Sequence, residues 1–171
     1  MDLRAFIRDI PDFPTPGVVF KDISPLLLDA RALDAAISGL AQLADPLKVD
    51  YVIGAEARGF ILGAALSREL HAGFVTARRP GKLPAETVSA EYALEYGLGS
   101  LEVHADAFAG GARVLIHDDV LATGGTAAAL CELVEQVGGE IAGCAFLIEL
   151  GFLEGRKRLA PRQVLSLIDY A

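Results

Sequence analysis

The sequence predicts one α/β domain over residues 1–171, with a mainly parallel central sheet flanked by helices on both faces. Two observations carry this prediction. Apolar strand-like segments alternate with helix-patterned segments, the order typical of parallel sheets, and the strands begin near residues 50, 73, 113, 141 and 164. The chain has 171 residues, 53% of them hydrophobic, which suffices for one domain with a sizeable core. Loops that follow parallel strands meet at one edge of a sheet, so candidate ligand loops should lie together there.

The N-terminal segment gives two predictions. Residues 2–9 carry apolar side chains on one side of a helical pattern and are expected to form a short helix. The stretch PDFPTPGVVFKDISP at 11–25 has four prolines around a β-prone piece at 18–20. Because proline fixes the backbone and prevents a long helix, the residues by themselves favour an irregular linker here.

Periodicity predicts the remaining elements. Helical spacing of apolar residues predicts helices over 30–44, after residue 60, and over 126–138, where Gly138 and Gly139 end the last helix. Strands are predicted over 50–54, 73–77, 114–116, 141–150 and 164–168. Residues 87–103 alternate loosely around two glycines, which predicts two strands joined by a turn; composition alone indicates an exposed β-ribbon.

The stretch RVLIHDDVLATGGT at 113–126 is the main candidate for a ligand site. An apolar strand leads to two adjacent acids, Asp118 and Asp119, and then to a turn before a helix; the turn consists of Ala122, Thr123, Gly124, Gly125 and Thr126. The glycines let the backbone approach a ligand, and a helix N-terminus with hydroxyl donors suits an anion. Paired carboxylates beside such a turn suggest two sugar hydroxyls, or a hard cation, next to a phosphate.

Basic residues follow two other predicted strands. Arg58 lies in the turn EARGF at 56–60, and an arginine at a strand end can bind a phosphate or pyrophosphate through two parallel hydrogen bonds. Arg78, Arg79 and Lys82 gather in RRPGKLP at 78–84, whose prolines and glycine exclude regular structure. Such a loop suits an anion clamp. From these residues alone, a surface salt bridge and a solvated loop remain the alternatives.

The composition excludes several functions. A net charge of −8 argues against nucleic acid as the main partner. No apolar run reaches the roughly 18 residues that span a bilayer, and no signal-peptide pattern is found, so a cytoplasmic protein without membrane contact is expected.

Cys131 and Cys144 lie in apolar contexts and are expected to be reduced core residues. The histidines form no metal-binding cluster, and His117 is expected to be structural.

DDVLATGGT resembles the motif with which type I phosphoribosyltransferases bind phosphoribosyl pyrophosphate (PRPP). The resemblance implies the fold of that family, with a small N-terminal hood over residues 1–30 and a flexible catalytic β-hairpin loop over 78–100. It also implies that Asp118 and Asp119 hold the ribose hydroxyls and that the 122–126 turn holds the 5′-phosphate. In this family, the turn that contains Arg58 holds pyrophosphate.

Three further motifs resemble adenine phosphoribosyltransferases: PDFPTPGVVFKDISP, GKLP at 81–84 and YALEYG at 92–97. By this resemblance, Val19 contacts adenine through its backbone and Phe20 stacks on the ring, an arrangement that suits a flat aromatic ligand. Lys21 and Val120 complete the implied adenine site. Lys21 stands where many relatives have arginine.

The resemblance also implies the catalytic groups, Glu95, Arg58 and Lys82. Glu95 corresponds to a loop glutamate that is proposed to handle a proton of the base, a task that a raised pKa within a closing loop would serve. Arg58, Arg79 and Lys82 are expected to bind pyrophosphate. Pro80 replaces a residue that is often basic in the family, so one cation of the familiar pattern is missing.

The implied reaction joins adenine to PRPP and gives AMP and pyrophosphate. Mg²⁺ is expected as the cofactor, held mainly through PRPP and without a firm protein ligand. A homodimer is expected, in which Arg79 is the candidate residue that one subunit lends to its neighbour's site. Two alternatives stay open: a phosphoribosyltransferase for another nucleobase, because the sugar motif does not name the base, and a PRPP-sensing regulator of the same fold.

Overall fold

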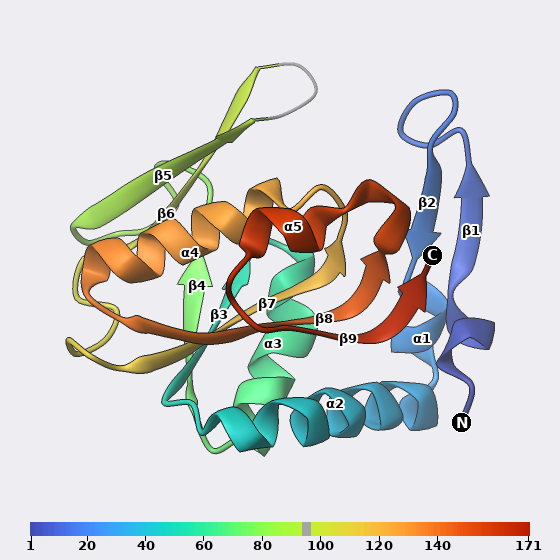
Figure 1. Cartoon of the computed structure of the whole chain (residues 1–171), viewed down its shortest axis with the longest axis horizontal. Coiled ribbons are helices and arrows are strands. Elements are labelled where there is room, and N and C mark those ends of the chain that lie inside the picture. Colours follow the sequence, from blue (N-terminus) through green and yellow to red (C-terminus); the bar gives the residue numbers. More distant parts are fainter. Residues whose placement is uncertain (94–96) are drawn as a thin grey trace.

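The structure is a computed structural model that describes residues 1–93 and 97–171. Its centre is a parallel five-stranded sheet in the order β4–β3–β7–β8–β9 (Figure 1). The strands are β3 (Tyr51–Ala55), β4 (Gly73–Ala77), β7 (Arg113–Leu121), β8 (Glu140–Leu150) and β9 (Val164–Tyr170). This arrangement confirms the predicted parallel α/β sheet.

Helices cover both faces of the sheet, as predicted (Figure 1). One face carries α1 (Ser24–Leu28), α2 (Ala30–Ala44) and α3 (Arg58–Glu69), and the other carries α4 (Gly125–Val137) and α5 (Gly155–Leu159). Each face of the sheet has its own hydrophobic core, and side chains of β7 point alternately into the two cores. Leu115 packs toward α2 and α3, whereas Val114 and Ile116 pack toward α4. All three side chains are fully buried, which accounts for the uninterrupted apolar run in this strand.

The predicted N-terminal helix was wrong beyond Phe6. A short 3₁₀ helix, η1 (Leu3–Phe6), is followed by β1 (Arg8–Pro11), which pairs with β2 (Val19–Asp22) in an antiparallel ribbon. Ion pairs from Arg8 to Asp22 and from Lys21 to Asp9 join the two strands. The stretch is therefore not an irregular linker, because strand pairing supplies the backbone hydrogen bonds that the proline-rich sequence cannot form locally.

The predicted hairpin at 87–103 is confirmed as β5 (Thr87–Ala93) and β6 (Leu98–His104), paired antiparallel. It is not a fully exposed ribbon: Ala90, Leu101 and Val103 are buried against the α4 side of the core. Alternation in a strand lets one face pack on the protein while the other faces water. Glu95 and the middle of YALEYG lie outside the described residues.

The two remaining short elements are 3₁₀ helices, η2 (Asp45–Leu47) after α2 and η3 (Gly151–Leu153) after β8. Asp29 caps α2, because its carboxylate accepts hydrogen bonds from the backbone N–H groups of Arg31 and Ala32. Among the described residues, no helix has the length and apolar character needed to cross a membrane.

Strand order places a topological switch point between β3 and β7. From β3 the chain moves to β4 on one side, and it later returns to place β7 on the other side. The loops after β3 and β7 therefore open beside each other, at the position where open α/β sheets bind ligands. β7 itself is longer than predicted: Asp118 and Asp119 belong to the strand, because β8 continues alongside it to Leu150.

Candidate active site

The end of β7 and the start of α4 enclose a cavity of about 200 Å³. The predicted residues Asp118 and Val120 and the whole 122–126 turn line it. Tyr92 and Ala93 of β5 form the opposite wall, with Leu121, Ala127 and Phe146 behind. The structure thus brings Asp118 and the small-residue turn together in one cavity, whereas Asp119 is not part of its lining.

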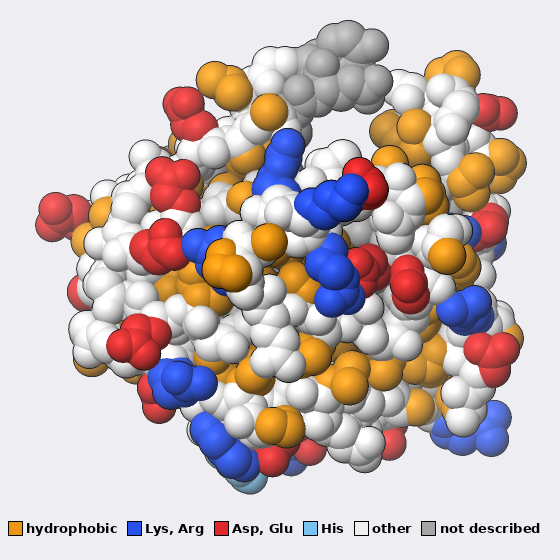
Figure 2. Space-filling view, viewed as in Figure 1, with side chains coloured by type: hydrophobic (Ala, Val, Ile, Leu, Met, Phe, Trp, Pro, Cys, Tyr) orange, Lys and Arg blue, Asp and Glu red, His pale blue; other side chains and the backbone are white. Residues whose placement is uncertain are grey.

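The 122–126 turn has the features of an anion cradle. Gly124 has a φ of +83°, in the left-handed region that favours glycine, and a methyl group on it would lie 2.7 Å from the Gly155 carbonyl oxygen. α4 begins at Gly125, so backbone N–H groups of its first turn lack partners within the helix and carry partial positive charge. α5 packs against this turn, and Figure 2 shows basic side chains gathered over α5.

Asp118 and Asp119 form a buried acidic pair. The Asp119 side chain is almost fully buried, and one Asp118 carboxylate oxygen accepts a hydrogen bond from the Asp119 backbone N–H at 2.9 Å. Burial, and next the neighbouring Asp119 carboxylate, raise the pKa of Asp118. α3 leaves room for this carboxylate because it has a glycine there: a methyl group on Gly59 would lie 3.0 Å from Asp118 Oδ1.

Arg58 connects the acidic pair to the N-terminal ribbon. Its Nε lies 3.1 Å from Asp119 Oδ2, an ion pair without the alignment of a hydrogen bond. Its Cζ lies 5.0 Å from the centre of the Phe20 ring, a cation–π distance. Phe13 packs edge-on against Phe20, with 5.2 Å between the two ring centres. Residues from three distant parts of the sequence therefore meet at the switch point.

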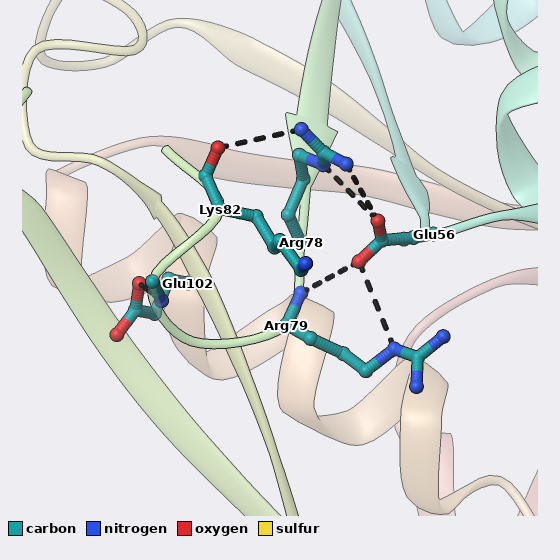
Figure 3. A network of polar contacts seen from close by, with 6 residues as sticks. Glu56, Arg78, Arg79, Lys82 and Glu102 are labelled. Carbon is teal, nitrogen blue, oxygen red and sulfur yellow. Dashed lines mark hydrogen bonds and ion pairs between the residues drawn. The ribbon is translucent and has the colours of Figure 1, made fainter. Parts of the chain in front are cut away.

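The basic loop is organised by Glu56, which the sequence analysis did not single out (Figure 3). The Glu56 carboxylate accepts hydrogen bonds from Arg78 Nε and Nη2 and from the backbone N–H of Arg79. These contacts, first the Arg79 N–H and then the Arg78 guanidinium, lower the pKa of Glu56. Glu56 could have been singled out from the sequence, because it lies in EARGF between a predicted strand and Arg58.

The three cations of this loop differ in whether an anion can reach them. Arg78 is held by Glu56 and also donates from Nη1 to the Lys82 carbonyl oxygen at 3.3 Å, so it braces the loop. The Arg79 side chain is 75% exposed and reaches Glu56 only at 3.8 Å, and Lys82 is exposed. Arg79 and Lys82 thus remain available to an anion, whereas Arg78 does not.

Lys21 also departs from its predicted place. Phe20 and Lys21 are consecutive residues of β2, so their side chains point to opposite faces. The Lys21 ammonium pairs with Asp9 at 2.7 Å and lies 4.0 Å from the centre of the Tyr170 ring. This geometry argues against an adenine contact through the Lys21 side chain. Val19 is half exposed on the same face as Lys21.

His117 is structural, as expected. It is fully buried in β7, and its Nδ1–H donates to the Ala145 carbonyl oxygen at 2.9 Å. Burial lowers the pKa of His117 to about 4, so the ring is neutral at pH 7. The two cysteines are free and buried, as predicted.

Comparison with known proteins assigns the fold and the family. The family model of the phosphoribosyl transferase domain matches residues 24–169. A curated adenine phosphoribosyltransferase from Rubrobacter xylanophilus is 60% identical over 98% of this chain and 91% of its own length. The chain belongs to the adenine phosphoribosyltransferase family. Membership identifies it as an enzyme and confirms the expected type I phosphoribosyltransferase fold.

Two solved structures agree with this assignment. The adenine phosphoribosyltransferase of Thermoanaerobacter pseudethanolicus is 51% identical, with a TM-score of 0.96 over 99% of this chain and 98% of that one. The Saccharomyces cerevisiae enzyme is 36% identical, with a TM-score of 0.93 over 97% of this chain and 96% of that one. The yeast structure contains adenine and an imino-altritol bisphosphate.

Proposed function

We propose that this protein transfers the 5-phosphoribosyl group from PRPP to adenine and releases AMP and pyrophosphate. One observation carries the proposal. Asp118 and the glycine turn line one cavity, and Arg58 links the adjacent Asp119 to Phe20 of the N-terminal ribbon. A phosphorylated sugar and a flat base can therefore bind side by side at the switch point. The names and ligands of the relatives point to adenine as the base.

The sugar phosphate fits the cavity on chemical grounds. The 122–126 turn offers backbone N–H groups and two threonine hydroxyls to the 5′-phosphate. Asp118 and Asp119 accept hydrogen bonds from the ribose hydroxyls. Asp119 Oδ2 is buried without a hydrogen-bond partner, and burying such a charged oxygen costs free energy. A hydroxyl group of the substrate would supply the missing hydrogen bond.

Adenine binds against the ribbon formed by β1 and β2. The Phe20 ring stacks on the base, the Val19 backbone contacts its edge, and Val120 packs against it from the cavity wall. The Arg58 guanidinium lies over one face of the Phe20 ring, so a base that stacks on that face displaces it.

In the reaction, a ring nitrogen of adenine forms a bond to the anomeric carbon of PRPP as the bond from that carbon to pyrophosphate breaks. Pyrophosphate leaves with the electron pair, and the ring nitrogen loses its proton to a base, for which Glu95 is our candidate. Arg58, Arg79 and Lys82 stabilise the negative charge that grows on pyrophosphate. Full turnover by a Glu95→Gln variant would remove Glu95 from this role.

Mg²⁺ fits this site as a companion of PRPP. Among the described residues, no group of three or more His, Cys, Asp or Glu side chains could hold a metal ion, so this part of the chain offers no all-protein cage. Magnesium commonly keeps several waters and binds through substrate phosphates, so PRPP itself would hold the ion without a firm protein ligand. When bound, it neutralises charge on pyrophosphate.

We also infer a homodimer with Arg79 near the neighbour's site. The extended, exposed side chain of Arg79 supports this role. Mixing subunits that carry Arg79→Gln with subunits that carry Arg58→Gln tests it. Activity above that of either variant alone supports a shared site, and no gain contradicts it.

The decisive experiment measures PRPP- and Mg²⁺-dependent turnover of adenine, hypoxanthine, guanine and xanthine, with AMP and pyrophosphate quantified. We expect adenine to be used in strong preference. Preference for an oxopurine would assign another nucleobase, and PRPP binding without product formation would assign a PRPP-sensing regulator.

A further inference from the structure

The cavity that receives the 5′-phosphate lacks a cation among its described lining residues. The charged side chain in its lining is Asp118, and no Lys or Arg of residues 1–93 and 97–171 lines it. A phosphate monoester carries about −1.5 to −2 charges at pH 7, and a neighbouring carboxylate repels it. Backbone N–H groups supply only partial positive charge. A full positive charge that reaches this cavity from just outside its wall would therefore add substantially to binding.

The short helix α5 lies directly behind the phosphate turn. Gly155 at its start lies so close to the turn that a methyl group on it would overlap the Ala122 carbonyl oxygen. A methyl group on Gly124 would lie 3.3 Å from Cβ of Arg158. α5 and the turn therefore pack backbone to backbone, and a side chain on this face of α5 needs only a short reach to the cavity.

Two anchors fix α5 in this position. The Leu159 side chain is fully buried in the core beneath α4. Arg156 donates from Nε and Nη2 to the buried Glu149 carboxylate at 2.9 and 2.6 Å and from Nη1 to the Val164 carbonyl oxygen. Ser166 donates a further hydrogen bond to Glu149, so this ion pair is well satisfied. Because one anchor is buried and the other is bidentate, the two residues between them, Lys157 and Arg158, are held in defined directions.

Of these two residues, Arg158 is the one that lies against the phosphate turn. A methyl group built on Gly125 would lie 3.2 Å from Arg158 Nη1, 3.6 Å from the Ala93 carbonyl oxygen and 4.0 Å from Thr123 Oγ1. Gly125, Ala93 and Thr123 all line the cavity, so the guanidinium stands at its rim.

The neighbouring cations have other partners. Arg156 pairs with Glu149, Lys157 with Glu154, and Arg162 with Glu135. In the part of the chain that the structure describes, no hydrogen bond or ion pair holds the Arg158 side chain. Arg158 is thus the cation of α5 that is placed for a ligand.

We propose that Arg158 is a substrate-binding residue whose guanidinium holds the 5′-phosphate of PRPP and AMP from the α5 side of the turn. The inference rests on the proposed function, because it takes the anion in this cavity to be a ribose 5-phosphate group. The planar guanidinium can bind phosphate oxygens through two hydrogen bonds while the backbone N–H groups bind the others. Since the 5′-phosphate does not change in the reaction, this contact strengthens binding of substrate and transition state alike.

The test compares Arg158→Gln with Lys157→Gln, which removes one charge from the adjacent position of the same helix. Calorimetry with ribose 5-phosphate and with PRPP gives the dissociation constants, and steady-state kinetics give KM and kcat. For Arg158→Gln we expect both dissociation constants and the KM for PRPP to rise by about tenfold or more, the scale of one charge-assisted hydrogen bond. We expect kcat and the KM for adenine to stay near their wild-type values. Lys157→Gln should behave like the wild type, and Arg158→Lys should recover part of the affinity.

The outcomes separate this inference from the proposed function. If the wild type forms AMP and Arg158→Gln binds ribose 5-phosphate as tightly as Lys157→Gln does, the role of Arg158 is overturned and the proposed function stands. If the wild type binds neither PRPP nor ribose 5-phosphate, both are overturned. A fall in kcat and Tm without a change in affinity would show that Arg158 only supports the packing of α5, which also overturns the inference.

Discussion

Arg58 and Asp119 form an ion pair at the switch point, with 3.1 Å between Nε and Oδ2, while the same guanidinium lies over the Phe20 ring. In the proposed reaction each of these three residues holds a different part of the substrates: pyrophosphate, ribose and base. Without substrates, they hold one another. The proposed reaction therefore requires that substrates replace these internal contacts and that Arg58 changes its partner.

Replacing Arg58 by glutamine should lower kcat by about 10²–10³-fold, the effect of removing one group that stabilises transition-state charge. Arg58→Lys keeps the positive charge but loses the planar guanidinium group, so its kcat should lie between those of the wild type and Arg58→Gln. Steady-state kinetics with saturating PRPP and adenine measure this effect. The matched control is Arg68→Gln at the other end of α3, which removes an exposed arginine paired with Glu69. Equal kcat values for the two glutamine variants would contradict the role of Arg58.

Phe20→Leu should raise the KM for adenine by about tenfold and leave the KM for PRPP unchanged, because stacking on an aromatic ring contributes about 1–3 kcal/mol per base. Phe20→Tyr keeps the ring face and serves as the control that restores binding. Fluorescence or calorimetric titration with AMP gives an independent affinity. If the Phe20→Leu variant binds adenine as tightly as the wild type does, the base does not stack on residue 20.

Asp118→Asn should weaken PRPP binding and, at the same time, stabilise the free protein at neutral pH. Burial and Asp119 raise the pKa of Asp118 in the folded chain above its value of about 3.9 in the unfolded chain. The stabilising protonated form is therefore fully present below about pH 3.9, and its contribution is lost as pH rises through the raised folded pKa. Asparagine is never ionised and avoids this loss.

Calorimetric melting from pH 4 to pH 8 tests this prediction. The Tm of Asp118→Asn relative to the wild type should increase as pH rises, while the exposed control Asp106→Asn should show no such trend. A Tm difference that shrinks toward pH 8, or unchanged PRPP affinity, would contradict the assignment of Asp118.

Gly155→Ala should disrupt the phosphate turn from behind. The added methyl group would overlap the Ala122 carbonyl oxygen, so α5 and the turn must separate. Forced packing of this kind costs about 1–3 kcal/mol, and we expect a lower free energy of unfolding together with weaker PRPP binding. Gly110→Ala is the control, since nothing lies within 4 Å of a methyl group there. Denaturant unfolding and PRPP titration measure the two effects, and wild-type values in both would show that the turn tolerates the shift.

Much of the fold was predictable because its signals are local. Helical spacing gave the bounds of α2, and the run 73–77 matched β4. Gly138, with a φ of +90°, ends α4 as predicted. Elements whose stability depends on a partner were missed or predicted too short. β1 forms by pairing with β2, and the second half of β7 forms by pairing with β8. α5 was also missed, because a helix of five residues shows little periodicity.

The candidate site divides in the same way. The cluster of Asp118, Asp119 and the 122–126 turn is contiguous in sequence, so its chemistry could be read directly. Glu56 was missed because its partners, Arg78 and Arg79, lie more than twenty residues away and reach it only through the pairing of β3 with β4. The same separation hid the proximity of Arg158 to Gly125.

Local patterns and motifs were enough to predict the layered α/β fold, the phosphorylated-sugar loop and the resemblance that names the base. Which charges are available became clear from the folded chain. It assigned Arg78 to Glu56 and Lys21 to Asp9, joined Arg58 to Asp119 and Phe20, and brought Arg158 to the phosphate turn. The physical reason is that charge pairing acts over a few ångströms in space, and separation along the chain carries no record of that distance.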